Sequence, residues 1–547
     1  MSDFLNMEFD VIGRTVSTKF EPNTSSKFHF WVADRDEVAG IIEIGNIVAA
    51  RSDEGDEITF GSVIEMRSYS DIDSFIADFL SHNFGEADVQ VPTDISEVVV
   101  VTCAVMRNLS GKTKPVPRSR AYFPSTLGIQ FSYGIVNEMG ESIFSGAPIP
   151  VGIFANGDGT RAQISVDEDF LVGPEGAHLN VSGISGLAAK TSAVQFTLKS
   201  LLAHSDKKIA VVMFNVKSRD LLFIDTPNSR LQDDNWSQQV YRDIGVAAEP
   251  FQDVLFFAPA DPRNPIGSQS LREEGVGSFS WDLQAIYRDI PSLFNPLDWD
   301  DRTEGAWHII QEEIEQGRIV TYIQMLKMVN DLIKNAGSNQ QWVRGVHIAT
   351  WNKMRSHLQR FPKAYKGLLK TAGPASDVDW SDLSAGRIFV VDIQMLNDRG
   401  QRLVFGRSVR AVYDMLESGE TDLDAIIVFV DELNKFAPSG NVRSPLKEVL
   451  IDITARGRSL GLILFGAEQF ASSVEKQIVE NSSTYLFGRT ETNELRTPNY
   501  SSLSDEVKTK LTMLPQGHLL VKFAKFPQPI FVRFPYPPCL PGDQYNL

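Results

Sequence analysis

The sequence predicts an α/β fold in which a small N-terminal β-barrel precedes a parallel sheet with a helical insertion. Three observations support this prediction. Short β-rich runs alternate with turns up to about residue 150, and buried-type strands alternate with helical stretches beyond residue 170. A long block of mainly helical pattern then separates two of the later strands. Strands that alternate with helices are typical of a parallel sheet covered on both faces.

Composition indicates a multidomain, packed protein. The chain has 547 residues, of which 42% are hydrophobic and 22% are charged. Its longest apolar runs, such as "AIIVFV", are far shorter than the ~20 residues of a membrane span. The acidic start "MSDFLNMEFD" lacks the basic region of a signal peptide. The two cysteines, Cys103 and Cys539, exclude a disulfide framework and a zinc cluster. We therefore expect a cytoplasmic protein without membrane association.

The net charge limits how the chain could bind nucleic acid. With 52 Lys and Arg against 70 Asp and Glu, the formal charge is −18. This charge opposes nonspecific adhesion to DNA over the whole surface, so any DNA contact must be local. A ring with a basic lumen alone would satisfy this condition.

Residues 1–150 are predicted to form the barrel. The β-rich runs are "DVIGRTVST", "KFHFWVA", "GNIVAARS", "EITFGSVIEM", "SEVVVVTCAVM" and "SIFSGAPIPVGIF". Val, Ile and Phe between Gly- and Asp-rich breaks favour a small barrel or sandwich. One helix is expected near "DIDSFIADFLSHNF", because four apolar residues there share a helical face: Ile72, Phe75, Ile76 and Phe79.

The remaining chain is predicted to form one α/β domain in three stretches, 151–270, 271–384 and 385–547. The first and third carry the strands "HLNVSG", "KKIAVVMFNV", "DVLFFAP", "GRIFVVDIQ", "AIIVFVDEL", "GLILFGAEQ" and "TYLFGRT". The second is a helical insertion with amphipathic segments near 305–316, 320–335 and 341–371. The tail "GHLLVKFAKFPQPIFVRFPYPP" predicts an antiparallel C-terminal hairpin on the sheet edge.

The stretch "HLNVSGISGLAAKTSAVQFTLKSLL", residues 178–202, predicts a strand, a small-residue loop and a helix. A Walker A loop has the form G-x-x-x-x-G-K-[ST]. Here Gly183 precedes Lys190 by seven residues rather than six, and Ala189 replaces the second glycine. A helix entrance with free N–H groups still favours phosphate. The candidate ATP-binding residues are Gly183, Ser185, Gly186, Leu187, Ala188, Ala189, Lys190, Thr191 and Ser192. An ordinary strand-to-helix turn remains the alternative.

The substitution at Ala189 raises a conformational question. If that position needs positive φ, alanine costs about 1 kcal/mol. A loop that is one residue longer could avoid this by turning at Gly186 instead.

A second half of the site is predicted at "DLDAIIVFVDELNKFAP". A four-residue apolar run ends in Asp431 and Glu432 at the carboxyl end of a strand, where ligands bind in open α/β sheets. Adjacent carboxylates there suit Mg²⁺, held by Asp431 and Thr191, with Glu432 polarising a water. A strand that merely ends in solvated acids is the alternative.

A third element is "ARGRSLGLILFGAEQ". Gln469, after the next strand, could sense or orient the attacking water. Arg456 and Arg458 could stabilise phosphate charge in a neighbouring subunit, or could form surface ion pairs. Lys217, Arg219, Lys435 and Arg443 are candidates for loops near a pore.

Together these features resemble the HerA family, in the HerA/FtsK branch of ring-forming P-loop ATPases. The resemblance covers nearly the whole chain and rests on "DVIGRTVS", "GNIV", "TFGSVIEM", "GPEGAHLNVSGISGLAAKTS", "VFVDEL" and "GLILFGAEQ". It implies a RecA-like sheet, a homo-hexamer, ATP and Mg²⁺ as cofactors, and double-stranded DNA in a central pore. The loop departs from archaeal repair members and is similar to bacterial antiphage members. There the partner is a sirtuin-like NADase or a nuclease, docked through the barrel.

The resemblance therefore implies an ATPase that translocates on or unwinds double-stranded DNA and activates an effector in antiviral defence. The alternative is a nucleotide-dependent scaffold that assembles and switches its partner without processive translocation. A monomeric metabolic NTPase or kinase would leave the barrel unexplained.

Overall fold

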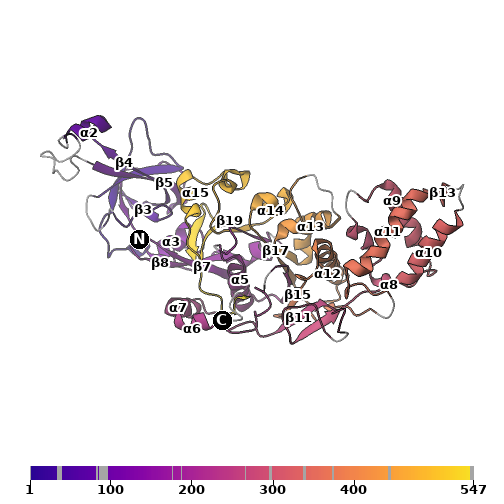
Figure 1. Ribbon diagram of the computed structural model, residues 1–547. Coiled ribbons are helices and arrows are strands. Elements are labelled where there is room, and N and C mark those ends of the chain that lie inside the picture. The colour runs from indigo at the N-terminus through magenta and orange to yellow at the C-terminus, as the bar shows by residue number, and fades with distance from the viewer. Residues whose placement is uncertain are drawn as a thin grey trace. The chain divides into compact units, whose positions relative to one another are not determined.

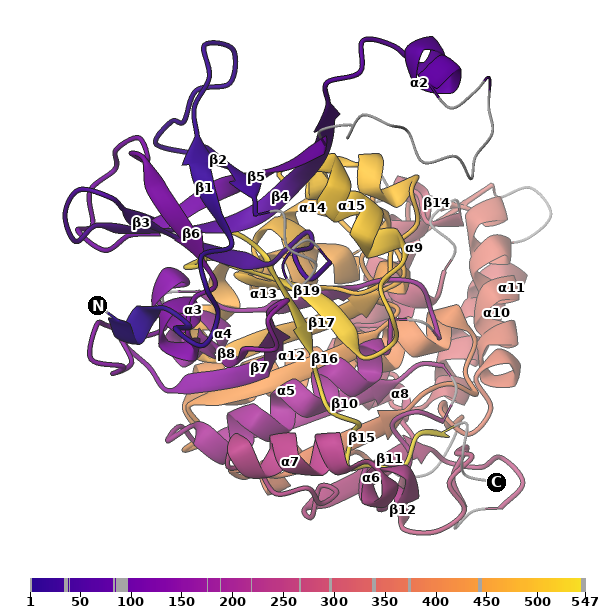
Figure 2. The same cartoon turned by 90° about the vertical axis from the view of Figure 1, so that its left-hand side faces the viewer.

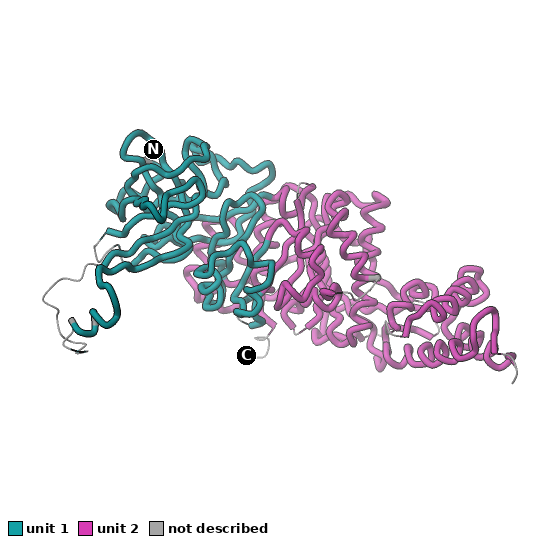
Figure 3. Tube along the Cα trace, turned by 90° about the horizontal axis from the view of Figure 1, so that it is seen from above, with its two compact units in different colours: residues 1–167, 183–189, 485–535 teal, residues 168–182, 190–484, 536–547 magenta. Residues whose placement is uncertain are grey.

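The computed structural model describes residues 2–33, 38, 40–81, 84, 97–174, 176–186, 188–217, 219–264, 267–294, 298–336, 341–371, 375–440 and 445–542. The chain forms two compact units (Figure 3). Unit 1 comprises Met1–Asp167, Gly183–Ala189 and Tyr485–Pro535, and unit 2 comprises Glu168–Ser182, Lys190–Thr484 and Tyr536–Leu547. The predicted fold class is confirmed: a mixed α/β chain with a large sheet and a closed N-terminal barrel.

The barrel in unit 1 closes in the strand order β1-β2-β5-β4-β3-β6. Alternate side chains of β2 are buried, as expected where one face of a strand lines a core. Phe28, Phe30, Val101 and Cys103 are fully buried inside it, and the Cys103 thiol is free. The strands are β1 (Gly13–Val16), β2 (Lys27–Val32), β3 (Ile47–Ser52), β4 (Ile58–Ser70), β5 (Glu97–Asn108) and β6 (Ser119–Tyr122).

The prediction that residues 142–154 form the last strand of the barrel is wrong. Its residues form β7 (Pro148–Ala155), which pairs with β8 (Arg161–Asp167) and with β20 (Ile530–Arg533) rather than with the barrel. The predicted C-terminal hairpin is confirmed as β19 (His518–Phe523) and β20. Its expected edge position is wrong, because β7 covers the outer side of β20.

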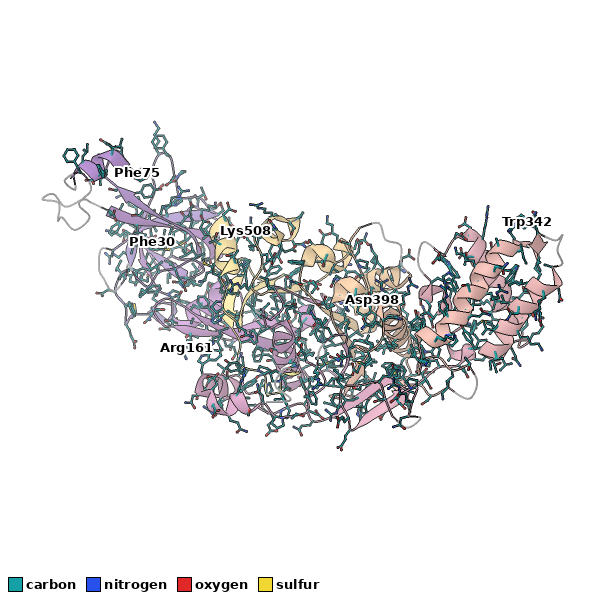
Figure 4. All side chains as sticks on the ribbon, in the orientation of Figure 1. Phe30, Phe75, Arg161, Trp342, Asp398 and Lys508 are labelled. Carbon is teal, nitrogen blue, oxygen red and sulfur yellow. The ribbon has the colours of Figure 1, made fainter. Side chains whose placement is uncertain are left out.

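Three α-helices lie among the residues of unit 1 that the structure describes. They are α2 (Phe75–Ser81), α3 (Thr126–Ser132) and α15 (Asp505–Thr512). The helix predicted near residue 75 is confirmed as α2, but its apolar side chains are exposed. Phe75, labelled in Figure 4, is 96% exposed, and Ile76 and Phe79 are also exposed. Helix α15 packs its buried Val507 and Leu511 into an apolar cluster with Phe487.

Unit 2 contains a parallel sheet in the order β12-β11-β15-β10-β16-β17-β9. All seven residues of β10 are buried, because helices cover both faces. Figure 2 shows α5 and α7 in front of these strands. The strands are β9 (Leu179–Ser182), β10 (Ile209–Asn215), β11 (Val254–Pro259), β12 (Val276–Phe279), β15 (Ile388–Asp392), β16 (Ala425–Asp431) and β17 (Leu462–Glu468).

Local sequence sets the ends of the covering helices. Helix α12 begins after Asn397, whose side chain accepts a hydrogen bond from the Gly400 N–H, and it ends at Gly419 with φ 69°. The helices around the sheet are α4 (Glu168–Leu171), α5 (Lys190–His204), α6 (Ser229–Asp233), α7 (Asn235–Asp243), α12 (Asp398–Ser418), α13 (Pro445–Arg456) and α14 (Lys476–Glu480). Strand β18 (Thr484–Phe487) follows α14 in the chain.

The predicted helical insertion is present between β12 and β15. It consists of α8 (Leu283–Ile286), α9 (Asp301–Glu315), α10 (Tyr322–Asn335) and α11 (Ile348–Ala364), with a small hairpin of β13 (Trp342–Val343) and β14 (Val346–His347) (Figure 1). A capping box of Thr321 and Gln324 starts α10. Strand β12, which the sequence did not reveal, pairs in parallel with β11.

Two further features of the described residues bear on the predictions. No helix among them has the length and apolar composition needed to cross a membrane. Cys539 is buried and free in the final segment of unit 2.

Candidate nucleotide site

The candidate site in unit 2 lies where α5 begins, at the carboxyl ends of β16 and β17. Lys190 is the first residue of α5, and only 8% of its surface is exposed. Its ammonium interacts electrostatically with three carboxylates, those of Asp431, Glu432 and Glu468. The register of the parallel strands explains this grouping, because Asp431 is opposite Ala467 and Glu468 is opposite Ser182. The sheet therefore gathers one buried cation and three acids at one edge.

Burial and neighbouring charges shift the pKa values of this cluster in opposite directions. Burial lowers the pKa of Lys190, while Asp431, Glu432 and Glu468 raise it. Burial raises the pKa of Asp431, while Lys190 lowers it. The carboxylates thus offset part of the cost of burying the ammonium, and a phosphate is an anionic partner of the same kind.

The backbone at Glu432 is unusual. Its φ of 61° and ψ of 47° place a non-glycine residue in the left-handed region, which costs about 1 kcal/mol. The N–H of Glu432 donates a 2.9 Å hydrogen bond to Oδ1 of Asp431. Glu432 Oε1 accepts a hydrogen bond of 2.9 Å from Nζ of Lys217. Such strain is found most often at functional positions.

The loop Gly183–Ala189 belongs to unit 1. The N–H of Ile184 donates to the Arg489 carbonyl at 2.8 Å, and that of Ala188 donates to the Ile184 carbonyl at 2.9 Å. Gly186 turns the loop with φ 80°, as the longer spacing suggested. The expectation that this turn frees Ala189 is wrong, because Ala189 also has positive φ, 48°. Leu187 lies outside the described residues.

Helix α5 presents Thr191 and Ser192 in its first turn, both half-buried. The donors present fit a nucleotide with Mg²⁺. Thr191 offers a hydroxyl and Asp431 a carboxylate, and Mg²⁺ commonly takes one or two such groups plus phosphate oxygens and waters. The described part of the chain holds no group of three His, Cys, Asp or Glu side chains that could bind a metal by itself.

The other predicted residues occupy two different edges of the sheet. Gln469 follows β17 directly and is half-buried at the carboxyl edge. Arg456 and Arg458 precede β17, at the opposite edge, and both are exposed. Arg456 pairs with Asp452 at 3.2 Å. A strand of this length separates the edges by about 20 Å, so these arginines do not reach the site of their own chain.

Two residues of the cluster were missed by sequence reasoning. Glu468 is fully buried, although it precedes Gln469 in a run that reads as an ordinary strand end. Lys217 was a candidate for a pore loop, yet it contacts Glu432. The sequence did contain a signal for Glu468. This residue is an acid at the end of an apolar strand, and it precedes Gln469, the predicted sensor. Arg443, another pore candidate, lies outside the described residues.

No protein-family model matches the chain, and no curated protein matches it. Among the solved structures with some similarity to the chain are a VirB4, a conjugative coupling protein and a genome packaging NTPase. VirB4 of Thermoanaerobacter pseudethanolicus has 15% identity and a TM-score of 0.45, covering 72% of this chain and 97% of that chain. The bacterial conjugative coupling protein TrwBdeltaN70 has 13% identity and a TM-score of 0.43, covering 68% and 87%.

The third is the genome packaging NTPase B204 from Sulfolobus turreted icosahedral virus 2 in complex with AMPPCP. It has 17% identity and a TM-score of 0.22, covering 27% of this chain and 69% of that chain.

Proposed function

We propose that the chain binds ATP and hydrolyses it at the edge of the sheet where α5 begins. The observation that carries this proposal is the burial of Lys190 beside Asp431 and Glu432. A buried ammonium at the start of a 15-residue helix, facing paired acids across a parallel sheet, suits a polyphosphate and its Mg²⁺. The small-residue loop that precedes Lys190 in the chain supports the same assignment.

In the proposed reaction each residue has a separate task. Lys190 binds phosphate oxygens, and Thr191 and Asp431 hold Mg²⁺, which neutralises phosphate charge when bound. Glu432 accepts a proton from the water that attacks the γ-phosphate. Gln469 orients that water through its amide.

We further propose that the chain works as a homo-hexamer that moves double-stranded DNA through a central pore and activates an effector in antiviral defence. The effector, a sirtuin-like NADase or a nuclease, would dock on the barrel. The resemblance to the HerA family supports this proposal. The exposure of Arg456 and Arg458, away from the site of their own chain, supports a role for at least one of them in a neighbouring subunit.

The alternative is a nucleotide-dependent scaffold that switches the effector without processive movement. The ion pair between Lys217 and Glu432 favours this alternative, because it occupies the carboxylate that hydrolysis needs. Effector activation by the variant Glu432→Gln separates the two proposals. Unchanged activation supports the scaffold, and lost activation supports the motor.

The basic test uses two variants of the full chain. Lys190→Ala should weaken binding of a fluorescent ATP analogue by about a hundredfold or more, because charged phosphate contacts are lost. Glu432→Gln should bind the analogue but hydrolyse ATP at least about a hundredfold more slowly. The control is Lys199→Ala, later in the same helix, where Nζ donates to the Glu249 carbonyl. Wild-type affinity in Lys190→Ala would refute the assignment of the site.

A further inference from the structure

Lys217 is the one basic side chain of the cluster that is substantially exposed. It follows β10 by two residues, and β10 pairs in parallel with β16, with Phe214 opposite Val430. This pairing brings Lys217 to the end of β16, where its Nζ lies 2.9 Å from Oε1 of Glu432. The side chain of Lys217 is 52% exposed, whereas that of Glu432 is 15% exposed. The contact therefore joins a half-exposed cation to a largely buried carboxylate.

The ion pair between Lys217 and Glu432 involves the carboxylate that acts as the base in the proposed reaction. A carboxylate oxygen that accepts a charge-assisted hydrogen bond from an ammonium is less available to take a proton from water. The left-handed backbone of Glu432 and the hydrogen bond from its N–H to Asp431 fix the backbone from which this side chain extends. Lys217 then holds the carboxylate at the other end of the side chain.

The pair is also easy to exchange. An ion pair with one half-exposed partner contributes little net stability, because water screens the ammonium of Lys217. Lys217 interacts with Asp431 and Asp220 besides Glu432, so acids surround it from its own loop and from the neighbouring strand. A phosphate group carries more negative charge than a single carboxylate and can compete for the same ammonium.

We propose that Lys217 is a positioning residue that restrains Glu432 through this ion pair and releases it when a phosphate takes the ammonium. The inference rests on the proposed function and adds a regulatory element to the same site. The releasing phosphate belongs to nucleic acid, because the nucleotide is already bound when turnover is measured at saturating ATP. Turnover of bound ATP is therefore low until this second phosphate arrives.

The test compares ATP hydrolysis by the wild-type chain with that by Lys217→Met, which keeps the aliphatic stem and removes the charge. We expect kcat to rise up to about fivefold, the range that an exposed ion pair can supply, while KM for ATP stays within about twofold. Lys217→Arg retains a cation and should turn over more slowly than Lys217→Met. A kcat that is unchanged or lower in Lys217→Met, or a tenfold rise in KM, would overturn the inference.

The matched control is Lys208→Met. Lys208 precedes the other end of β10 and pairs with Asp422 at 2.7 Å, with a side chain that is similarly exposed. It lies at the amino edge of the sheet, so its loss should leave kcat at the wild-type value. An equal rise in both lysine variants would show a general effect of lost charge and would contradict the inference.

Added double-stranded DNA tests the source of the releasing phosphate. Stimulation of the wild-type chain that disappears in Lys217→Met assigns the releasing phosphate to nucleic acid. An equal response to DNA in both chains would overturn the inference. Failure of the wild-type chain to bind ATP would overturn the proposed function itself, whereas normal binding and hydrolysis without acceleration in Lys217→Met would overturn only this inference.

Discussion

Nδ1 of His178 accepts a hydrogen bond of 2.9 Å from the backbone N–H of Leu464. Its Nε2 donates to the carbonyl of Thr454 at 3.1 Å, which fixes the neutral tautomer with the proton on Nε2. The buried ring thus connects the residue before β9 to β17 and to helix α13. Protonation of Nδ1 would break the contact with Leu464.

The first prediction concerns stability in acid. Burial lowers the pKa of His178 from its usual 6.5 to about 4. Because the unfolded chain binds this proton more readily, the stability contributed by neutral His178 is present above pH 6.5 and is lost as pH falls toward 4. The loss should reach about 3 kcal/mol. Thermal unfolding midpoints measured from pH 7.5 to 4 test this expectation.

The variant His178→Asn isolates this contribution, since asparagine tolerates the left-handed backbone of φ 70° but does not titrate. It should be less stable at pH 7.5 by about 1–3 kcal/mol, because buried hydrogen bonds are lost. Its midpoint should then fall less between pH 6.5 and 4 than that of the wild-type chain. Parallel pH profiles would contradict the assignment.

The second prediction concerns nucleotide binding in alkali. Burial lowers the pKa of Lys190, so affinity for an ATP analogue should decline with rising pH before an ordinary lysine would titrate. Glu468 raises the pKa of Lys190, and Glu468→Gln should therefore move the decline to lower pH. The affinity difference between the two chains should be larger at pH 9.5 than at pH 7.5.

A suitable control for that measurement is Glu480→Gln, an acid that pairs with Lys476 on the surface helix α14. Its binding profile should overlay that of the wild-type chain. If Glu468→Gln also overlays it, then Glu468 does not support the charge of Lys190.

The third prediction concerns the two glycines of the loop. A Cβ at Gly183 would lie 2.6 Å from Cβ of Ala188, and its φ of 148° already disfavours a side chain. Gly186 has φ 80° but open space around it, so Gly186→Ala should add only about 1 kcal/mol of backbone strain. Gly183→Ala should lower the thermal unfolding midpoint more than Gly186→Ala. The reverse order would mean that the contact with Ala188 does not constrain the loop.

The fourth prediction concerns the helical insertion. Glu313 of α9 accepts hydrogen bonds from Arg318 and, at 2.6 Å, from Arg344. These bonds lower the pKa of Glu313 to about 2. Its contribution is thus present above pH 4.5 and is lost as pH falls toward 2. Because both arginines are half-exposed, Glu313→Gln should reduce stability by only about 1 kcal/mol at pH 7.

Limited proteolysis within the insertion reports this change locally. Cleavage in Glu313→Gln should be faster than in the wild-type chain at pH 7, and the difference should shrink as the pH is lowered toward 2 with an acid-active protease. Glu304→Gln alters an exposed acid of the same helix and should leave cleavage unchanged.

Much of the fold could be predicted because its strands can be recognised from their own residues. Strands buried on both faces need continuous apolar runs, and those of β10, β16 and β17 are unmistakable. The acids that end β16 were equally visible, since Asp431 follows such a run directly. The pairing of β7 could not be foreseen, because an alternating strand fits a barrel and an open sheet equally well.

Contacts between residues that are far apart in the sequence could not be predicted either. Lys217 and Glu432 are separated by 215 residues and meet only because β10 lies beside β16. The positive φ of Ala189 and Glu432 could not be foreseen either, because neither residue type prefers that region. The exposed apolar face of α2 reads in the sequence like any core-facing helix. Local sequence patterns thus predicted the helices and strands. The contacts between distant residues depended instead on the order of the strands in the sheet.

The enclosure of both native thiols has a practical consequence for labelling experiments. Burial raises the pKa of Cys103 well above its usual range and that of Cys539 to about 12. The thiolate is the form that reacts with maleimides, so both should stay inert in the folded chain. A single cysteine introduced at an exposed position such as Phe75 would then carry a fluorophore selectively, and no native cysteine would need replacement.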